Sequence, residues 1–215
     1  MVHGARRWLL GVSAALLAID ILHAQPGPEV VVRVYNTERP AQTTITVAQE
    51  VAAAIFDRAG VRLRFRHCES PDDACDDVLA PGEVVARFVR SGRQGAPVFG
   101  YAIIDHRAGA GTLATIFVDR VATAAVRLDI DGSALLGRSL AHELGHLLLG
   151  TNTHAIKGLM RGCWTDRELR CHRPNDWVFS RQEAHQLRAG AGRRLVVPDA
   201  RLVASATRVV MEGVR

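Results

Sequence analysis

The chain has 215 residues, enough for one domain of ordinary size that buries a core without help from metals or disulfides. Its hydrophobic share of 48% excludes a largely disordered protein. Aromatic residues are only 5%, and the basic residues behind the net charge of +5 are spread along the chain, so we expect no nucleic-acid partner.

The N-terminal segment is typical of a secretory signal peptide. Arg6 and Arg7 precede an almost uninterrupted apolar run over 8–22. The small residue Ala24 before Gln25 gives a passable cleavage site for a signal peptidase. The run is short for a membrane span and contains Asp20, although an uncleaved N-terminal anchor is the alternative. We therefore expect an exported protein, secreted or periplasmic, whose mature chain has no membrane span.

The cysteines favour disulfide bonds, because an exported chain with four cysteines can pair them in an oxidising compartment. Their spacing predicts two local bridges, Cys68–Cys75 and Cys163–Cys171, each closing a short polar loop. A metal site built from cysteines is less favoured, because no Cys-x-x-Cys pair occurs.

The remaining pattern predicts an α/β (α+β) domain. In chain order, we expect a strand over 29–35, a helix over 44–58, strands over 61–66, 83–89, 98–104 and 113–118, a long helix from about 131 to 149, and a short helix over 180–187. Asp131 or Ser133 can cap the long helix, and Ser180 with Glu183 has the spacing of a capping box. We thus divide the chain into a signal peptide (1–24), one catalytic domain (25–190) and a C-terminal tail of uncertain structure (191–215).

The segment that carries chemistry is His142-Glu143-Leu144-Gly145-His146, an HExxH motif on the long predicted helix. Residues four apart share one face of a helix, so His142 and His146 can offer two imidazole nitrogens to one zinc ion. Glu143 is one residue further round, where it can reach a water molecule on the metal. The alternative is a pair of helix-packing histidines with an incidental glutamate. An apolar stripe faces the core instead and comprises Leu136, Leu140, Leu144 and Leu147.

Downstream of this helix come Gly150, which can end it, then His154 and Met160. This order resembles the metzincin clan of zinc endopeptidases, whose signature is HExxHxxGxxH followed by a Met-turn. The resemblance implies a single domain with a twisted mixed sheet, an antiparallel edge strand, a long N-terminal helix and an active-site helix. It also implies that His154 is the third zinc ligand and that Met160 lies below the site.

The spacing departs from that signature, because this chain reads HExxHxxxGxxxH. The third ligand is therefore open to competing donors, namely Asp166, Glu168 and His172. We favour His154, because a helix ended by glycine and a nearby histidine need no further element. The plain alternatives are a solvated loop histidine for His154 and core filling for Met160.

The tryptophans Trp164 and Trp177 flank the second cysteine loop, and we expect them to form a small satellite core rather than a substrate platform. Asp105 and Asp119 end predicted strands and are expected to accept hydrogen bonds in turns.

Together these features predict an exported, monomeric zinc endopeptidase in which Zn²⁺ is held by three histidines and Glu143 is the general base. The substrate, a peptide or protein, would extend along an exposed edge strand, either 98–104 or 113–118. Two alternatives remain open. One is a zinc-stabilised binding protein without turnover, which a closed four-ligand site would indicate, and the other is a zinc hydrolase of non-peptide amides.

Overall fold

The computed structural model describes residues 27–37, 41–68, 75, 77–91, 98–171 and 173–195. The predicted signal peptide and most of the predicted tail lie outside these residues. The elements, in chain order, are β1 (Glu29–Asn36), α1 (Gln42–Arg58), β2 (Arg62–His67), β3 (Glu83–Val89), β4 (Gly100–Asp105), β5 (Ala110–Phe117), α2 (Val118–Leu128), α3 (Gly132–Leu149), α4 (Asp166–Leu169), η1 (Pro174–Trp177) and α5 (Arg181–Leu195). None of the described helices combines the length and apolarity that a membrane crossing requires.

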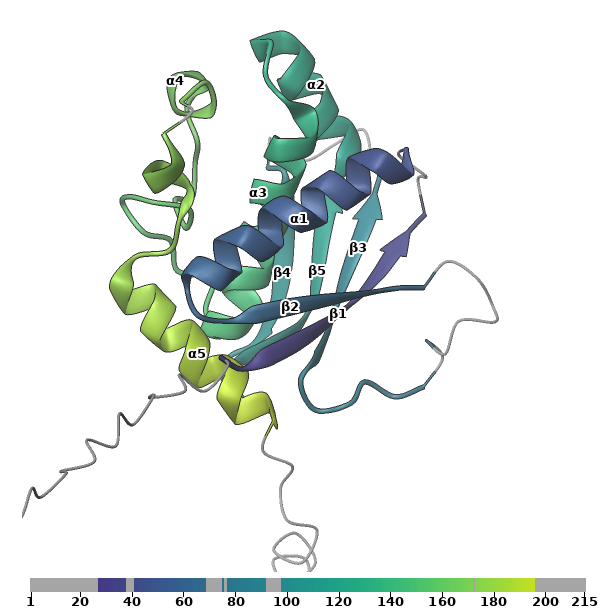
Figure 1. The fold of residues 1–215 in the computed structure, drawn as a ribbon, viewed down its shortest axis with the longest axis vertical. Helices are drawn as coiled ribbons and strands as arrows, with labels where there is room; N and C mark the ends of the chain where they lie inside the picture. Colours follow the sequence, from purple (N-terminus) through teal and green to yellow (C-terminus); the bar gives the residue numbers. More distant parts are fainter. Residues whose placement is uncertain are drawn as a thin grey trace, which may run out of the picture.

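The strands form one five-stranded sheet in the order β2-β1-β3-β5-β4 (Figure 1). All neighbouring pairs are parallel except β4 and β5, which run antiparallel. This arrangement confirms the predicted α/β fold with a mixed sheet and an antiparallel edge strand. Because β5 lies between β3 and β4, it has no free edge, and the prediction that residues 113–118 could be an edge strand is wrong.

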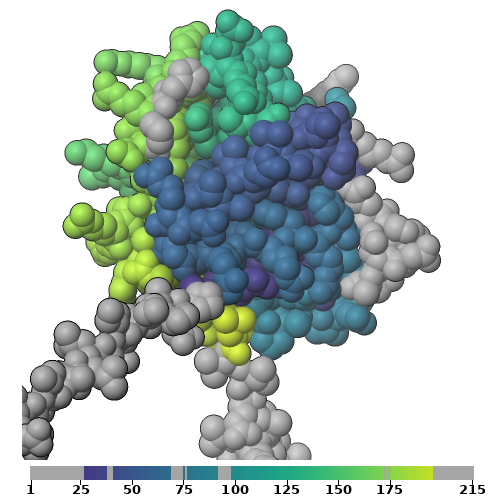
Figure 2. All heavy atoms as spheres, viewed as in Figure 1, coloured from purple at the N-terminus to yellow at the C-terminus, as the bar shows by residue number. Residues whose placement is uncertain are grey.

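Two long helices pack on the sheet and on each other. Figure 1 shows α1 crossing one face of the sheet, and Figure 2 shows its side chains covering much of that face. The crossing with α3 is close at Gly137, where a Cβ atom would lie 2.6 Å from the carbonyl oxygen of Ala48. The α3 stripe of Leu136, Leu140 and Leu147 is at most 2% exposed, as predicted. This packing fixes one side of α3 and leaves the opposite side for chemistry.

The structure adds elements that the sequence pattern did not indicate. Helix α2 begins directly after β5, and its N-cap residue Phe117 makes no side-chain cap, so the usual start signal is missing. Its buried stripe nevertheless has helical spacing, from Val121 through Ala124 to Leu128. Helix α5 begins as predicted after the Ser180 capping box but continues to Leu195, beyond the predicted end at 187.

The cysteine predictions have opposite outcomes. Cys68 and Cys75 form a disulfide, as predicted. Cys163 and Cys171 are free, so the second predicted bridge is wrong. The physical reason lies between them, where Thr165 and Glu168 form a capping box that starts the helical turn α4. Beyond that turn the Cys171 thiol donates a hydrogen bond to the Asp176 carboxylate, at 3.0 Å, while Cys163 is exposed.

Candidate metal centre

The two ends of helix α3 are fixed by capping residues. The Asp131 side chain accepts hydrogen bonds from the amides of Ser133 and Ala134, at 2.8 and 3.1 Å, which satisfies the first turn. Gly150 ends the helix with φ at 68°, in the left-handed region that glycine adopts readily. A Cβ at Gly150 would also lie 1.9 Å from the carbonyl oxygen of Gly109, so only glycine fits.

Three histidine side chains meet beside α3. The Nε2 atom of His146 lies 3.1 Å from Nε2 of His142 and 3.2 Å from Nε2 of His154. One nitrogen from each ring falls within 4.8 Å of the others, a set that could hold a metal ion. The first two histidines come from adjacent turns of α3, and the third comes from the loop that returns after Gly150.

Two backbone carbonyls fix the tautomers of the helix histidines. The Nδ1 atom of His142 lies 2.9 Å from the carbonyl oxygen of Leu159, and that of His146 lies 2.7 Å from the carbonyl oxygen of Thr151. A carbonyl can only accept, so each Nδ1 carries the proton and each Nε2 of a neutral ring presents a lone pair. Two lone pairs 3.1 Å apart cannot bond to each other, whereas a shared cation would satisfy both.

The electrostatics keep these rings neutral. Burial, with smaller contributions from the neighbouring histidines, lowers the pKa of His142 to about 4. Burial also lowers the pKa of His146. Because metals bind the neutral imidazole, the depressed pKa values leave the nitrogen lone pairs available near neutral pH.

The third histidine is placed by a tight return of the chain. The amide of Ala155 donates to the carbonyl oxygen of Met160, at 2.7 Å, and a short parallel bridge pairs Ala155 with Arg161. Met160 itself is 1% exposed and lies against α3, where a Cβ on Gly145 would be 2.8 Å from its sulfur. The loop thus brings His154 to the helix histidines and buries Met160 under the same helix.

Glu143 lies beside the cluster at the start of β4. Its side chain is buried, and a Cβ on Gly100 would lie 3.0 Å from its Oε1 atom, so the glycine makes room for the carboxylate. Among the described residues no group donates a hydrogen bond to this carboxylate, and burial raises its pKa to about 8. A glycine inside a predicted strand is a known sign of close approach, so the sequence did hold a signal for Gly100.

A cavity of about 1230 Å³ opens beside these residues. Its walls come from the start of β4, from α2 and α3, and from the segments 152–154 and 161–169. Figure 1 shows α4, the end of the second segment, opposite α2. Trp164 lines this cavity and meets the His142 ring edge-on, with the ring centroids 5.4 Å apart. It also packs on Trp177 at 5.1 Å. The two tryptophans thus form the predicted small core. Trp164 also lines the cavity, a role that the sequence interpretation missed.

The competing donors are engaged elsewhere. The Glu168 carboxylate accepts hydrogen bonds from the amide and hydroxyl of Thr165, at 2.8 and 2.9 Å, and forms an ion pair with Arg161. The Asp166 carboxylate makes a bidentate pair with Arg127, at 2.6 and 2.9 Å. Neither belongs to the histidine cluster, and the third competitor named above, at position 172, lies outside the described residues. The Thr-x-x-Glu spacing at 165–168 was a readable sign of this capping role.

The fold and the cluster together define an α/β protein with a three-histidine candidate metal centre. No family model matches the chain, and neither does any curated protein. Among solved structures, it is similar to an archaemetzincin from Methanopyrus kandleri, with 17% identity over 80% of this chain and 100% of that chain and a TM-score of 0.48. It is also similar to metalloproteinase-II from Bacteroides fragilis, with 11% identity over 77% of this chain and a TM-score of 0.50. The match spans 54% of that second protein, and at this identity it shows a shared fold.

Proposed function

We propose that this protein is an exported zinc-dependent endopeptidase whose metal is held by His142, His146 and His154. The observation that carries the proposal is the convergence of three imidazole nitrogens within 4.8 Å. The donor set fits the ion, because zinc is bound by neutral imidazoles and two of these rings have the tautomer that binding requires. The similarity in fold to a metalloproteinase is consistent with the same class.

When bound, zinc would supply a Lewis acid that polarises a carbonyl group and makes an attacking water a stronger nucleophile. Glu143 is the residue of this chain that moves the proton. Its Oε1 atom, held beside Gly100, takes the proton from the attacking water and later delivers it to the leaving amine. The buried position that raises its pKa to about 8 makes this carboxylate a stronger base than a solvated one.

The substrate is a peptide or protein segment that extends along β4. This strand pairs with β5 on one side, and its start at Gly100 lies against Glu143. An extended peptide beside an edge strand gains main-chain hydrogen bonds, and this would place one peptide bond next to the proton-transfer group. The adjoining cavity, with Trp164 in its wall, offers space for one substrate side chain.

A zinc-stabilised protein without turnover would need a fourth protein ligand to close the site. Within the described residues the cluster contains three donors, and both Asp166 and Glu168 are paired with arginines away from it. This arrangement leaves a coordination position for water or substrate, as in catalytic zinc sites, and favours an enzyme.

Export is supported by the disulfide between Cys68 and Cys75, because disulfides persist in oxidising compartments. The proposed signal peptide (1–24) would direct that export, with cleavage after Ala24. Sequencing the N-terminus of the protein recovered from its producing cells tests this part. A chain that starts with the uncleaved segment would replace the signal peptide with an anchor.

The test of the function is peptide-library hydrolysis by the zinc-loaded protein and its Glu143→Gln variant. Losing the general base should reduce turnover by about 10²–10⁴-fold, since acid–base catalysis contributes that much. Zinc content should stay unchanged, and the unfolding midpoint should not fall, because the amide removes a carboxyl whose burial raises its pKa. Glu50→Gln, on the exposed face of α1, is the matched control and should keep full activity. A Glu143→Gln variant that loses its zinc or keeps near-normal turnover contradicts the assigned role, and hydrolysis restricted to non-peptide amides would change the substrate class.

A further inference from the structure

The three histidines of the centre are not held in the same way. The rings of His142 and His146 are buried, and each is anchored through Nδ1 to a backbone carbonyl. His154 is exposed, and within the described part of the chain its Nδ1 atom has no hydrogen-bond partner. Its only polar contact there is through Nε2, the atom that faces His146. No hydrogen bond from Nδ1 to a described residue therefore orients this ring, unlike the other two.

Gly162 lies directly against the His154 ring. A Cβ atom at position 162 would lie 3.0 Å from Cγ, 3.1 Å from Nδ1 and 3.3 Å from Cβ of His154. These are the three nearest contacts, and all of them belong to the same side chain. The glycine is not needed for backbone conformation, because Gly162 is absent from the residues with positive φ. Its missing side chain is thus explained by the imidazole alone.

The backbone fixes this contact. The hydrogen bond from Ala155 to Met160 and the bridge between Ala155 and Arg161 close a small loop. His154 directly precedes that loop and Gly162 directly follows it, so the loop sets Gly162 beside the imidazole. The His142 ring stacks on the same imidazole, with the ring centroids 5.4 Å apart.

We propose that Gly162 is a positioning residue of the metal centre: its lack of a side chain leaves the space in which the His154 ring reaches the ligand position, whereas carbonyl acceptors orient the other two histidines. This inference rests on the proposed zinc function. Ligand distances tolerate only about 0.2 Å, and a methyl group at 162 would displace the ring by a few tenths of an ångström, so the third ligand would be misplaced.

The experiment measures zinc affinity of Gly162→Ala by competition with a chelator of known affinity. We expect binding to weaken by about 10–100-fold, the range seen when a residue supporting a ligand is changed. Gly192→Ala is the matched control, because a Cβ there meets no heavy atom within 4 Å, and it should bind zinc like the unaltered protein. The unfolding midpoints of all metal-free proteins are recorded to show that the fold is intact.

A double-mutant comparison separates positioning from general damage. In a His154→Ala background, adding Gly162→Ala should cause no further loss of zinc affinity, because the effect passes through the ring. In the metal-free protein, the ring-proton resonances of His154 should shift in Gly162→Ala, while those of His142 and His146 stay in place.

Unchanged affinity in Gly162→Ala, or an equal loss in both backgrounds, would overturn the proposal. The proposed function has a different point of failure, namely an unaltered protein that binds no zinc. In that case the metal-free resonances still decide whether Gly162 positions the ring, and an unshifted His154 would refute it.

Discussion

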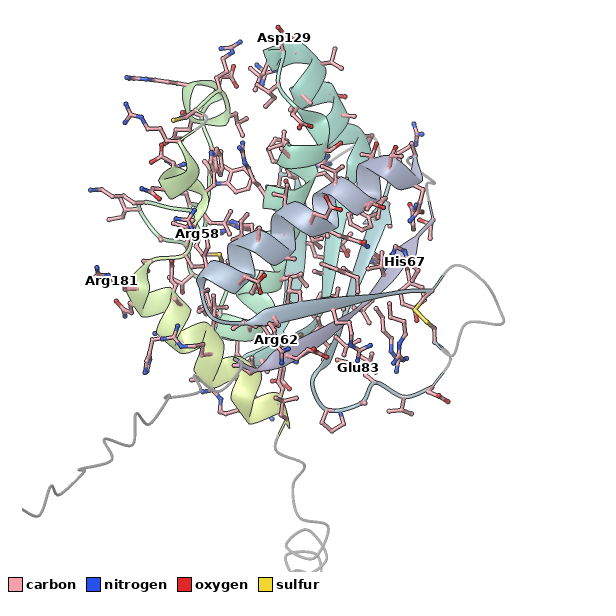
Figure 3. The ribbon with its side chains drawn as sticks, viewed as in Figure 1. Arg58, Arg62, His67, Glu83, Asp129 and Arg181 are labelled. Carbon is pink, nitrogen blue, oxygen red and sulfur yellow. A yellow bond between two sulfur atoms is a disulfide. The ribbon has the colours of Figure 1, made fainter. Side chains whose placement is uncertain are left out.

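Two buried polar clusters in the described part of the chain differ in whether their groups satisfy one another. Near β1, Arg33 and Glu83 are 3% and 7% exposed and form an ion pair. Figure 3 labels Glu83 and draws the disulfide as a yellow bond. Arg33 also donates to the carbonyl oxygens of Cys75 and Asp77, at 3.0 and 2.7 Å. In this cluster donors meet acceptors, and the charges neutralise each other.

Beside β4, His142, Glu143 and His146 are also buried, but these groups do not satisfy one another. The Nε2 atoms of His142 and His146 face each other as acceptors, and Glu143 has no donor among the described residues. Buried polar groups are normally paired, so a set that lacks its counterpart points to a ligand. The first cluster therefore explains how the sheet is tied to the segment around Cys75, and the second supports the proposed metal site.

The paired cluster can be broken by Glu83→Gln. Removing one partner of a buried ion pair leaves the Arg33 charge uncompensated and should lower the free energy of unfolding by about 3–5 kcal/mol. Glu29→Gln is the control, because its pair with Arg64 is exposed and is expected to contribute at most about 1 kcal/mol. Chemical denaturation at neutral pH measures both. Zinc affinity should not change, and a loss of zinc in Glu83→Gln would show that the clusters are coupled.

The same pair predicts a pH dependence. Burial alone would raise the pKa of Glu83, but the hydrogen bonds from the Ala80 amide and Arg33, with the charges of Arg33 and Arg66, lower it below its ordinary value of 4.5. A carboxyl with a depressed pKa stabilises the fold above its unfolded pKa, and this contribution is lost as the pH falls through the folded value. The difference in free energy of unfolding between the unaltered protein and Glu83→Gln should thus become smaller below about pH 4.5. A constant difference down to pH 2 would contradict the pairing.

Adding and removing zinc tests whether the histidine cluster binds the ion. A ligand that binds only the folded state stabilises it, by about 2.7 kcal/mol at a free concentration 100 times Kd. We expect this gain for the unaltered protein, its reversal by a chelator, and its loss in His146→Ala. Thermal unfolding with and without zinc measures the effect, and equal stabilisation of His146→Ala would place the ion elsewhere.

The smallest effect is expected at the mouth of the cavity. The Arg127–Asp166 pair joins α2 to α4, but both side chains are more than half exposed, and exposed ion pairs contribute little to stability. Asp166→Ala should therefore change neither stability nor zinc affinity appreciably. A chelator competition in which this variant loses zinc would show that Asp166 reaches the metal.

Local signals predicted much of this structure. Residues 83–89 were predicted as a strand and form β3 with the same bounds, and Asp131 and Gly150 delimit α3 as expected. The position of His154 next to the HExxH histidines also agrees with the expectation, although its role as a ligand stays a prediction. These successes share a cause, since caps, glycine stops and side-chain periodicity act over a few residues.

The misses depend on contacts between distant segments. Trp164 borders the cavity because the loop after Met160 folds back on α3, and the sequence around it reads as packing. Cys171 faces Asp176 rather than Cys163, because the capped turn α4 directs the chain between them. Helix α2 lacks a start signal because it continues directly from β5. In each case the outcome depends on packing between distant segments, which the spacing of residues along the chain does not reveal.

The most direct test of the account is the zinc stoichiometry and affinity of four proteins, namely the unaltered chain, His154→Ala, Glu168→Ala and Glu143→Gln. We predict one zinc per chain in the unaltered protein and an affinity at least about 10–100-fold weaker in His154→Ala, because a ligand contributes no less than a residue that supports one. Glu168→Ala and Glu143→Gln should bind as the unaltered chain does. A Glu168→Ala variant that loses zinc while His154→Ala keeps it would contradict the three-histidine centre.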